Sequence, residues 1–257
     1  MRSLKPLSTA FLTAALALGL AVHGKAKQTP LFQGTVFVAP DLILADDPSN
    51  FLKIRYKGQA ERSMFDRRLD GWKTYSAYLF EASFKDSTPI EMQVNPEFGN
   101  VQAASAEAEK YARAIGQLPS LLRAGVKTSW IHKGKELYGG GNDNILIHTG
   151  QTVEYESQGV MEEALLHEAT HTTLDGRHSK APRWSAAQKS DPAFPSDYAE
   201  KNPAREDLAE SYLLYLAVKY KPGRLPAGYQ EKIERGLPAR LAYLHSVPGK
   251  LSPFAQR

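Results

Sequence analysis

The segment His167-Glu168-Ala169-Thr170-His171 decides how this chain is interpreted. In a helix, residues four apart lie on one face, so the two imidazoles can reach a single metal ion. Glu168 then lies beside the ion, where it can take a proton from a bound water molecule and need not bind the metal itself. The spacing therefore predicts a zinc site with a carboxylate base next to it.

The surrounding residues predict that this segment is helical. From Gly159 to Leu174 the chain reads GVMEEALLHEATHTTL, and spacings of three and four place both histidines on the apolar side. Asp175-Gly176 is predicted to stop the helix. The alternative is two core histidines on a packed helix. Two imidazoles and a carboxylate are costly to bury without a partner such as a metal, which favours the zinc site.

A catalytic zinc site needs a third protein ligand and leaves the fourth position for water. Glu206 is the strongest candidate, because Asn202-Pro203 predicts the start of a helix that carries Glu206 and, one turn later, Glu210. One carboxylate can bind the metal while the other orients a ligand histidine. His178 is the runner-up. Asp175 lies too far along the helix axis to converge on one ion with both histidines.

HEATH followed by EDLAE (Glu206 to Glu210) resembles the gluzincin arrangement of zinc metallopeptidases, in which a second helix supplies E-x-x-x-D or E-x-x-x-E. The segment Ser196 to Ser211 is similar to the catalytic domain of anthrax lethal factor and its relatives, in which a tyrosine precedes that helix. Thr170 replaces the family's glycine before the second histidine. The resemblance implies zinc ligands at His167, His171 and Glu206, a general base at Glu168, a supporting carboxylate at Glu210 and an oxyanion-stabilising hydroxyl at Tyr198.

The resemblance also implies a fold and an activity. The fold is α+β and zincin-like, with a β-containing N-terminal lobe and a helical C-terminal lobe around a zinc cleft. The activity is hydrolysis of peptide bonds in a peptide or protein substrate. One alternative is a zincin-fold protein that binds zinc without catalysis, although such a protein has no need of Glu168. Another is a metal-free helical protein in which HEATH is coincidental.

The N-terminus predicts export. Residues 1–26 contain Arg2 and Lys5, then a mostly apolar run too short to span a bilayer, and Gly24-Lys25-Ala26 offers a cleavage site. No later segment is apolar enough to cross a membrane. Without residues 1–26, which hold three of the 32 basic residues and no acidic ones, the formal charge of +4 becomes +1. Nucleic acid is therefore not a predicted partner.

The chain contains no cysteine, which excludes disulfides, thiolate ligands and a cysteine nucleophile. Export without cysteine favours a bacterial periplasmic or secreted protein over a small eukaryotic secreted domain. Residues 27–257 are predicted to form one domain, with a β-rich lobe at 27–100 and a helical catalytic part at 101–257. No pattern in the sequence predicts a particular oligomeric state.

Alternating apolar residues predict strands at Thr35 to Val38, at Ala77 to Phe84 and at Pro89 to Phe98, the last two joined by a hairpin turn. A helix is predicted from Ser105 to Leu118. Two further strands are predicted, at Thr128 to His132 and at Ile145 to His148. In zincins an edge strand above the metal helix pairs with the substrate backbone, so the resemblance implies this role for one of the two.

Three further features have mainly structural interpretations. Asp66-Arg67-Arg68 is predicted to form a structural ion pair or a solvated face rather than a functional site. His132 and His148, each alone in a strand, are predicted to be structural rather than ligands. Gly139-Gly140-Gly141 is not a phosphate loop, because no lysine and no helix start follow it, and it is predicted to be a flexible rim of the cleft.

Overall fold

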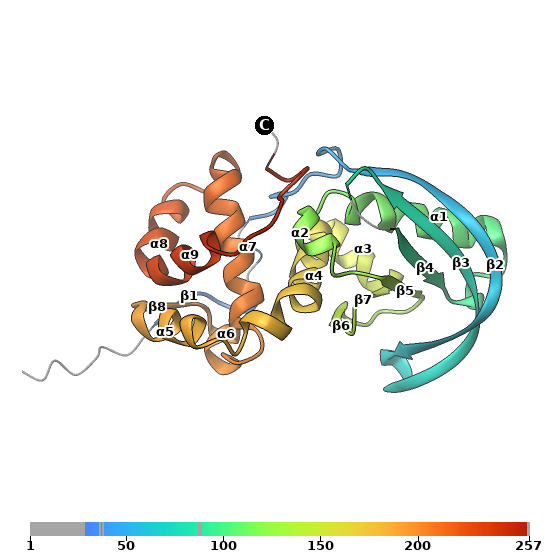
Figure 1. Cartoon of the computed structure of the whole chain (residues 1–257), viewed down its shortest axis with the longest axis horizontal. Helices are drawn as coiled ribbons and strands as arrows, with labels where there is room; N and C mark the ends of the chain where they lie inside the picture. The colour runs from blue at the N-terminus through green and yellow to red at the C-terminus, as the bar shows by residue number, and fades with distance from the viewer. Residues whose placement is uncertain (1–28, 36, 38, 87–88, 256–257) are drawn as a thin grey trace, which may run out of the picture.

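One long helix, α4 (Met161–His178), separates a mixed β-sheet from a layer of helices in the computed structural model of the chain (Figure 1). The structure describes residues 29–255 except 36, 38, 87 and 88. The predicted signal sequence at 1–26 lies outside the described residues. The mixture of a sheet with separate helices confirms the predicted α+β class.

The sheet has six strands in the order β2-β3-β4-β5-β7-β6. They are β2 (Phe51–Asp66), β3 (Gly71–Phe84), β4 (Ile90–Val94), β5 (Thr128–His132), β6 (Gly139–Gly141) and β7 (Asn144–His148). Neighbouring strands are antiparallel except for the parallel pairs β4–β5 and β5–β7. Because β5, β6 and β7 follow residue 100, the β-rich lobe extends beyond the predicted range of 27–100.

Helices cover the sheet and form the second lobe. On the sheet side lie α1 (Val101–Ile115), α2 (Ser120–Arg123) and α3 (Thr149–Ser157). The helical lobe contains α5 (Pro182–Ser190), α6 (Asp197–Lys201), α7 (Asp207–Tyr220), α8 (Tyr229–Gly236) and α9 (Pro238–His245). The residues that the structure describes also include the short 3-10 helices η1 (Arg67–Leu69), η2 (Pro96–Phe98) and η3 (Pro222–Arg224). Among the described helices, none is long and apolar enough to span a bilayer.

A two-stranded parallel sheet ties the beginning of the described chain to the helical lobe. It consists of β1 (Thr29–Phe32) and β8 (Ala193–Ser196). The ammonium group of Lys232, on α8, lies 4.4 Å from the ring centroid of Phe32 and donates a hydrogen bond to Leu31 O. The first strand is therefore held by pairing, by a cation–π contact and by a hydrogen bond.

Helix α4 is buried on more than one side, as its position between two layers requires. Leu165 and Leu166 point in different directions around the helix, yet both are fully buried. The predicted stop at Asp175-Gly176 is wrong. Gly176 keeps helical backbone, and the helix ends only after His178, where Ser179 N donates to Asp175 O. A glycine at this position lowers helix propensity without ending the helix.

The predicted start of the second helix is also wrong. Ser196 caps the short helix α6, since its Oγ accepts a hydrogen bond from Ala199 N, and Asn202 ends α6. Residues 203–206 form turns, and α7 begins at Asp207 with Glu206 as the residue that precedes it. Because Ser196 caps a helix that ends at Asn202, the next helix begins at Asp207 and not at Pro203 as predicted.

The strand predictions had mixed outcomes. β3 and β4 pair antiparallel and confirm the predicted hairpin, and β5 has the predicted bounds. The strand at Thr35 to Val38 is wrong, because Thr35 lies in a bend and Phe37 in irregular chain, while residues 36 and 38 lie outside the described residues. Within the described part of the chain, the first strand is β1.

Asp66 organises a buried cluster at the end of β2. Its carboxylate accepts hydrogen bonds from the Arg68 guanidinium and from Tyr75 OH. The contact between Asp66 and Arg68 confirms the predicted ion pair. His132, fully buried on β5, lies 3.7 Å from Asp66 Oδ2 and stacks on His148 at a centroid distance of 5.3 Å. Burial lowers the pKa of His132 to about 4, although Asp66 opposes this shift.

This cluster predicts a pH dependence of stability. As the pH falls from 6.5 towards 4, the unfolded chain binds a proton at His132 that the folded protein does not, so the free energy of unfolding decreases. Between pH 6.5 and pH 4, we expect the His132→Gln variant to lose about 3 kcal/mol less unfolding free energy than the native protein. Urea unfolding at a series of pH values measures this difference. An unchanged decrease in the variant would contradict the interpretation.

Candidate metal centre

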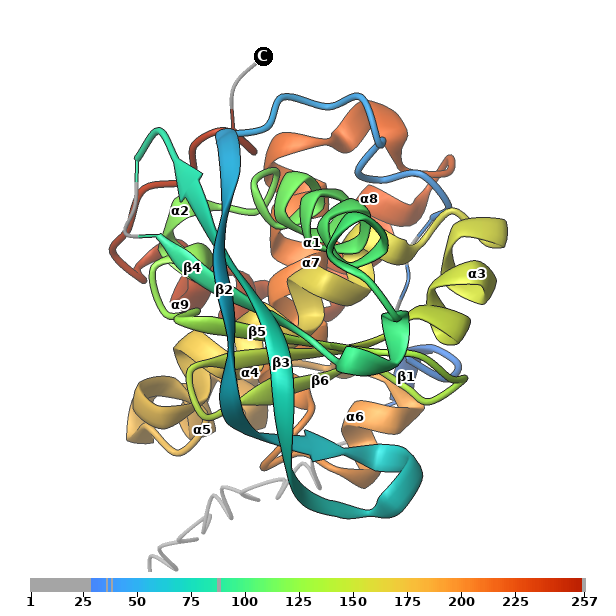
Figure 2. The same ribbon diagram turned by 90° about the vertical axis from the view of Figure 1, so that its right-hand side faces the viewer.

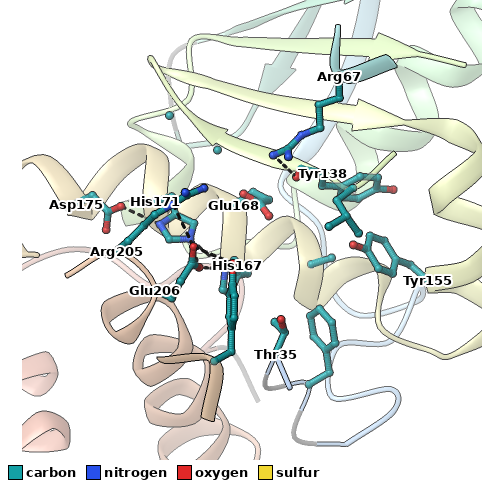
Figure 3. Close-up of a pocket in the computed structure, with 16 residues that line it drawn as sticks. Thr35, Arg67, Tyr138, Tyr155, His167, Glu168, His171, Asp175, Arg205 and Glu206 are labelled. Carbon is teal, nitrogen blue, oxygen red and sulfur yellow. Dashed lines mark hydrogen bonds and ion pairs between the residues drawn. The ribbon is translucent and has the colours of Figure 1, made fainter. Parts of the chain in front are cut away.

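Three side chains converge between α4 and α7 (Figure 3). His167 and His171 come from one face of α4, with their Nε2 atoms 3.0 Å apart. Glu206 directs Oε2 at both rings, 3.4 Å from His167 Nε2 and 3.2 Å from His171 Nε2. His167 and Glu206 are buried, and His171 is nearly so. Within the described residues, these three form the metal-capable group of histidine, aspartate and glutamate side chains.

The three donor atoms suit zinc in type and in spacing. Imidazole nitrogen and carboxylate oxygen are common zinc ligands, and donors about 2.0–2.1 Å from a tetrahedral ion lie about 3.3 Å from one another. The observed separations are 3.0, 3.2 and 3.4 Å. The residues present therefore fit a three-ligand metal site.

Glu206 reaches the histidines because the start of α7 is anchored. Glu206 N donates to Asn202 O, and Glu206 O accepts from Glu210 N as α7 begins. The next residue, Asp207, is fully buried and forms an ion pair with Arg240 of α9, at 3.0 Å. The ion pair fixes the first turn of α7 and with it the backbone of Glu206.

Asp175 orients His171, a role that the sequence analysis missed. Its Oδ2 accepts a hydrogen bond of 2.8 Å from His171 Nδ1, which leaves Nε2 directed at the cluster. A carboxylate partner of this kind fixes the tautomer and ring orientation of a ligand histidine. The spacing of four residues on one helix was the available signal, since Asp175 had been considered only as a ligand.

Glu210 and Tyr198 lie close to the cluster in different ways. Glu210 Oε2 accepts a hydrogen bond of 2.6 Å from Ser196 Oγ, so this contact joins α7 to β8 and does not involve a ligand histidine. Tyr198 OH donates to Glu206 Oε1 at 3.2 Å, and Arg205 Nε lies 3.2 Å from the same oxygen. One oxygen of Glu206 therefore faces the histidines while the other is held by neighbours.

Neighbouring groups shift the pKa values of His171 and Glu206 in opposite directions. Burial opposes protonation of His171, but hydrogen bonds to Asp175 and Glu206 raise its pKa to about 10. Burial raises the pKa of Glu206, yet the two histidines outweigh this and hold it well below its usual range. A metal ion must displace the His171 proton, so metal affinity decreases as the pH falls.

The cluster opens into a cavity of about 450 Å³, which lies within the range of small-molecule and peptide sites. Glu168 lines this cavity together with His167, His171, Tyr198 and Glu206. Figure 3 shows Glu168 beside the two histidines, with Tyr138, Tyr155 and Arg67 on the side of the sheet. The proposed base and ligands therefore share one open space.

His178 is directed elsewhere. It lies at the end of α4, and its Nδ1 is 2.7 Å from the hydroxyl of Tyr243 on α9. The structure thus brings Glu206, and not the runner-up His178, to the two histidines.

The edge strand beside the cavity is β6, and the two strands expected to provide an edge, β5 and β7, are internal. A type I′-like turn joins β6 to β7, because Asn142 and Asp143 both have positive φ. A methyl group at Gly140 would lie 2.0 Å from Glu168 O, so glycine allows β6 to pack directly on the backbone of α4. The three glycines therefore form a strand, of which Gly140 and Gly141 line the cavity.

This close approach predicts opposite effects for two glycine substitutions. We expect Gly140→Ala to lower the free energy of unfolding by about 1–3 kcal/mol, because either β6 or α4 must move. Gly176→Ala is the matched control on α4. It meets no atom within 4 Å and keeps helical backbone, and it should raise stability by up to about 1 kcal/mol. Denaturant unfolding measures both, and a native-like Gly140→Ala would contradict the packing argument.

No protein-family model, no curated protein and no solved structure matches this chain.

Proposed function

We propose that this protein is a zinc-dependent peptidase of the gluzincin type with a zincin-like fold. The observation that supports this most strongly is the convergence of His167, His171 and Glu206 in a cavity that Glu168 also lines. Two chain segments separated by 35 residues contribute the ligand types that the motif predicts. Coincidental core histidines would not require a buried carboxylate from a distant segment, just before α7, to face both rings.

The roles of the residues follow from their positions. His167, His171 and Glu206 would hold zinc. When bound, the ion would act as a Lewis acid and lower the pKa of a water molecule at its open position. Glu168 accepts the proton of the attacking water and then delivers it to the leaving amine. Asp175 keeps His171 Nε2 directed at the cluster. Tyr198 positions Glu206 through its hydroxyl, and its contact with a developing oxyanion stays a prediction.

The substrate is proposed to be an extended peptide that pairs with β6. This strand is one of the two edges of the described sheet and borders the cavity through Gly140 and Gly141. Strand addition satisfies the backbone of a peptide independently of its sequence, while pockets on either side select side chains. One face of β6 packs on the backbone of α4, and the free edge of the strand is the part proposed to pair with the peptide.

We also propose that the protein acts outside the cytoplasm of a bacterium, in the periplasm or after secretion. Support comes from the composition of residues 1–26 and from the absence of cysteine, as argued from the sequence.

Zinc content tests the ligand assignment. Purified mature protein is expected to contain one zinc per chain by elemental mass spectrometry. Loss of a residue that only hydrogen-bonds a ligand typically lowers metal affinity by roughly 10–100-fold. Glu206→Ala removes a ligand itself, so it should weaken zinc binding by more than that. His178→Ala is the control and should retain zinc. Full occupancy in Glu206→Ala would contradict the assignment, and no zinc in the native protein after reloading would contradict the proposed function.

A further inference from the structure

A second cavity, of about 270 Å³, lies beside the metal-site cavity and shares Arg67, Gly140 and Gly141 with it. Its apolar walls are Phe65, Trp72, Trp130 and Leu146. This volume is below the roughly 300–1,000 Å³ of pockets that hold whole ligands, so it suits a single side chain.

Two cross-strand pairs build the walls of this cavity. Phe65 on β2 is opposite Trp72 on β3, at the end of the long hairpin, and Trp130 on β5 is opposite Leu146 on β7. Figures 1 and 2 show the far end of the β2–β3 hairpin curving towards the edge of the sheet that carries β6. The hairpin thereby brings Trp72, which is distant in sequence, next to the edge strand β6.

The aromatic rings are ordered against one another, yet one remains half exposed. Trp72 meets Trp130 edge-on at a centroid distance of 5.1 Å and Phe65 at 5.9 Å. Trp130 is buried, whereas Trp72 is 53% exposed. A large aromatic surface held open at the mouth of a cavity is typical of a contact site for an apolar group.

The two cavities lie on opposite faces of β6. A methyl group at Gly140 would collide with Glu168 O, on the α4 face, whereas one at Gly139 would lie 2.8 Å from Arg67 Nη2, on the other face. Successive side chains of a strand paired with β6 also point to alternate faces. One side chain of a bound peptide therefore faces the metal cluster, and the next faces the aromatic cavity.

From this geometry we infer that the aromatic cavity holds an aromatic side chain of the peptide substrate, one residue away from a side chain that faces the metal cluster. The inference rests on the proposed function and names its preferred substrate class. Arg67 lies at the boundary of the two cavities, with its guanidinium donating to Tyr138 O at 2.9 Å. The positive charge of Arg67 favours an aromatic ring in the cavity and disfavours a basic side chain there.

Binding can be tested without turnover because the chain has three tryptophans that act as separate reporters. Trp72 and Trp130 line the cavity, whereas Trp184 is fully buried against Tyr243 in the helical lobe. The protein, carrying Glu168→Gln and labelled with ¹⁵N at its indoles, is titrated with capped hexapeptides of glycine and alanine that contain one phenylalanine or none. The phenylalanine peptide should shift the Trp72 and Trp130 signals and leave Trp184 unchanged.

Trp72→Ala should weaken binding of the phenylalanine peptide about tenfold relative to the alanine peptide. Leu69→Ala is the control, since Leu69 is 57% exposed in the same hairpin turn but does not line the cavity. Equal affinity for both peptides would overturn the inference. So would Trp72 signals that change with protein concentration alone, because a second copy would then cover the cavity. Selective indole shifts without any cleavage by the zinc-loaded native protein would instead refute only the proposed function.

Discussion

Replacing Glu168 with Gln is expected to lower kcat by roughly 10²–10⁴-fold and to leave zinc content unchanged. Glutamine has the shape of the native side chain but cannot accept a proton at neutral pH, so the step that removes a proton from water loses its base. Glu168 lines the cavity without belonging to the three-ligand group, and its loss therefore should not affect metal binding. Cleavage of a quenched fluorescent peptide library and elemental analysis measure the two quantities.

Glu168→Asp is the matched variant, because it keeps a carboxylate at a slightly greater distance from the attacking water. It should retain more activity than the glutamine variant, as general base catalysis depends on both the group and its position. Loss of zinc in Glu168→Gln would show that this residue is a ligand. Full activity in the same variant would refute its role as the base.

Arg240→Leu is expected to lower the free energy of unfolding by about 3–5 kcal/mol, because it leaves two buried carboxylates without their cation. Arg240 is fully buried and bridges Asp191, at 3.1 Å, and Asp207, at 3.0 Å. For a chain of this size, the change corresponds to a decrease in Tm of roughly 10 °C. Calorimetry of the purified protein measures it.

Arg235→Leu is the control for this prediction. Arg235 forms an ion pair of 2.6 Å with Glu231 on α8, but its side chain is 79% exposed, so its loss should leave Tm nearly unchanged. Because Asp207 directly follows Glu206, we also expect Arg240→Leu to weaken zinc binding. A folded Arg240→Leu variant with native Tm would contradict the role of the ion pair.

The local parts of the site could be predicted from the sequence. The spacing of His167 and His171 depends only on helical geometry, and Glu206 followed from residue type and from its place near a helix start. The bounds of α7 were wrong because Ser196 caps an earlier helix, a competition that no single segment reveals. Asp175 was missed because it was considered only as a ligand, although its spacing of four residues from His171 on one helix allows the contact.

The parts of the fold that depend on distant segments could not be predicted. β2 contains many charged residues and is exposed along much of both faces, so its alternation is weak. β6 consists of glycine alone and carries no hydrophobic pattern. Its place at the sheet edge arises from pairing with β7 and from contact with Glu168 of α4. The aromatic cavity joins β2, β3, β5 and β7, and its composition follows from that pairing.

The pairing of β1 with β8 affects the order in which the molecule can fold. The two strands are about 160 residues apart in sequence, and contacts at such separation form late because a long loop must close first. A growing chain that has not yet reached Ala193 contains both histidines but neither the partner of its first strand nor Glu206. The chain therefore acquires the partner of β1 and the carboxylate that faces the two histidines within the same short stretch, between Ala193 and Glu206, and products that end before it have neither.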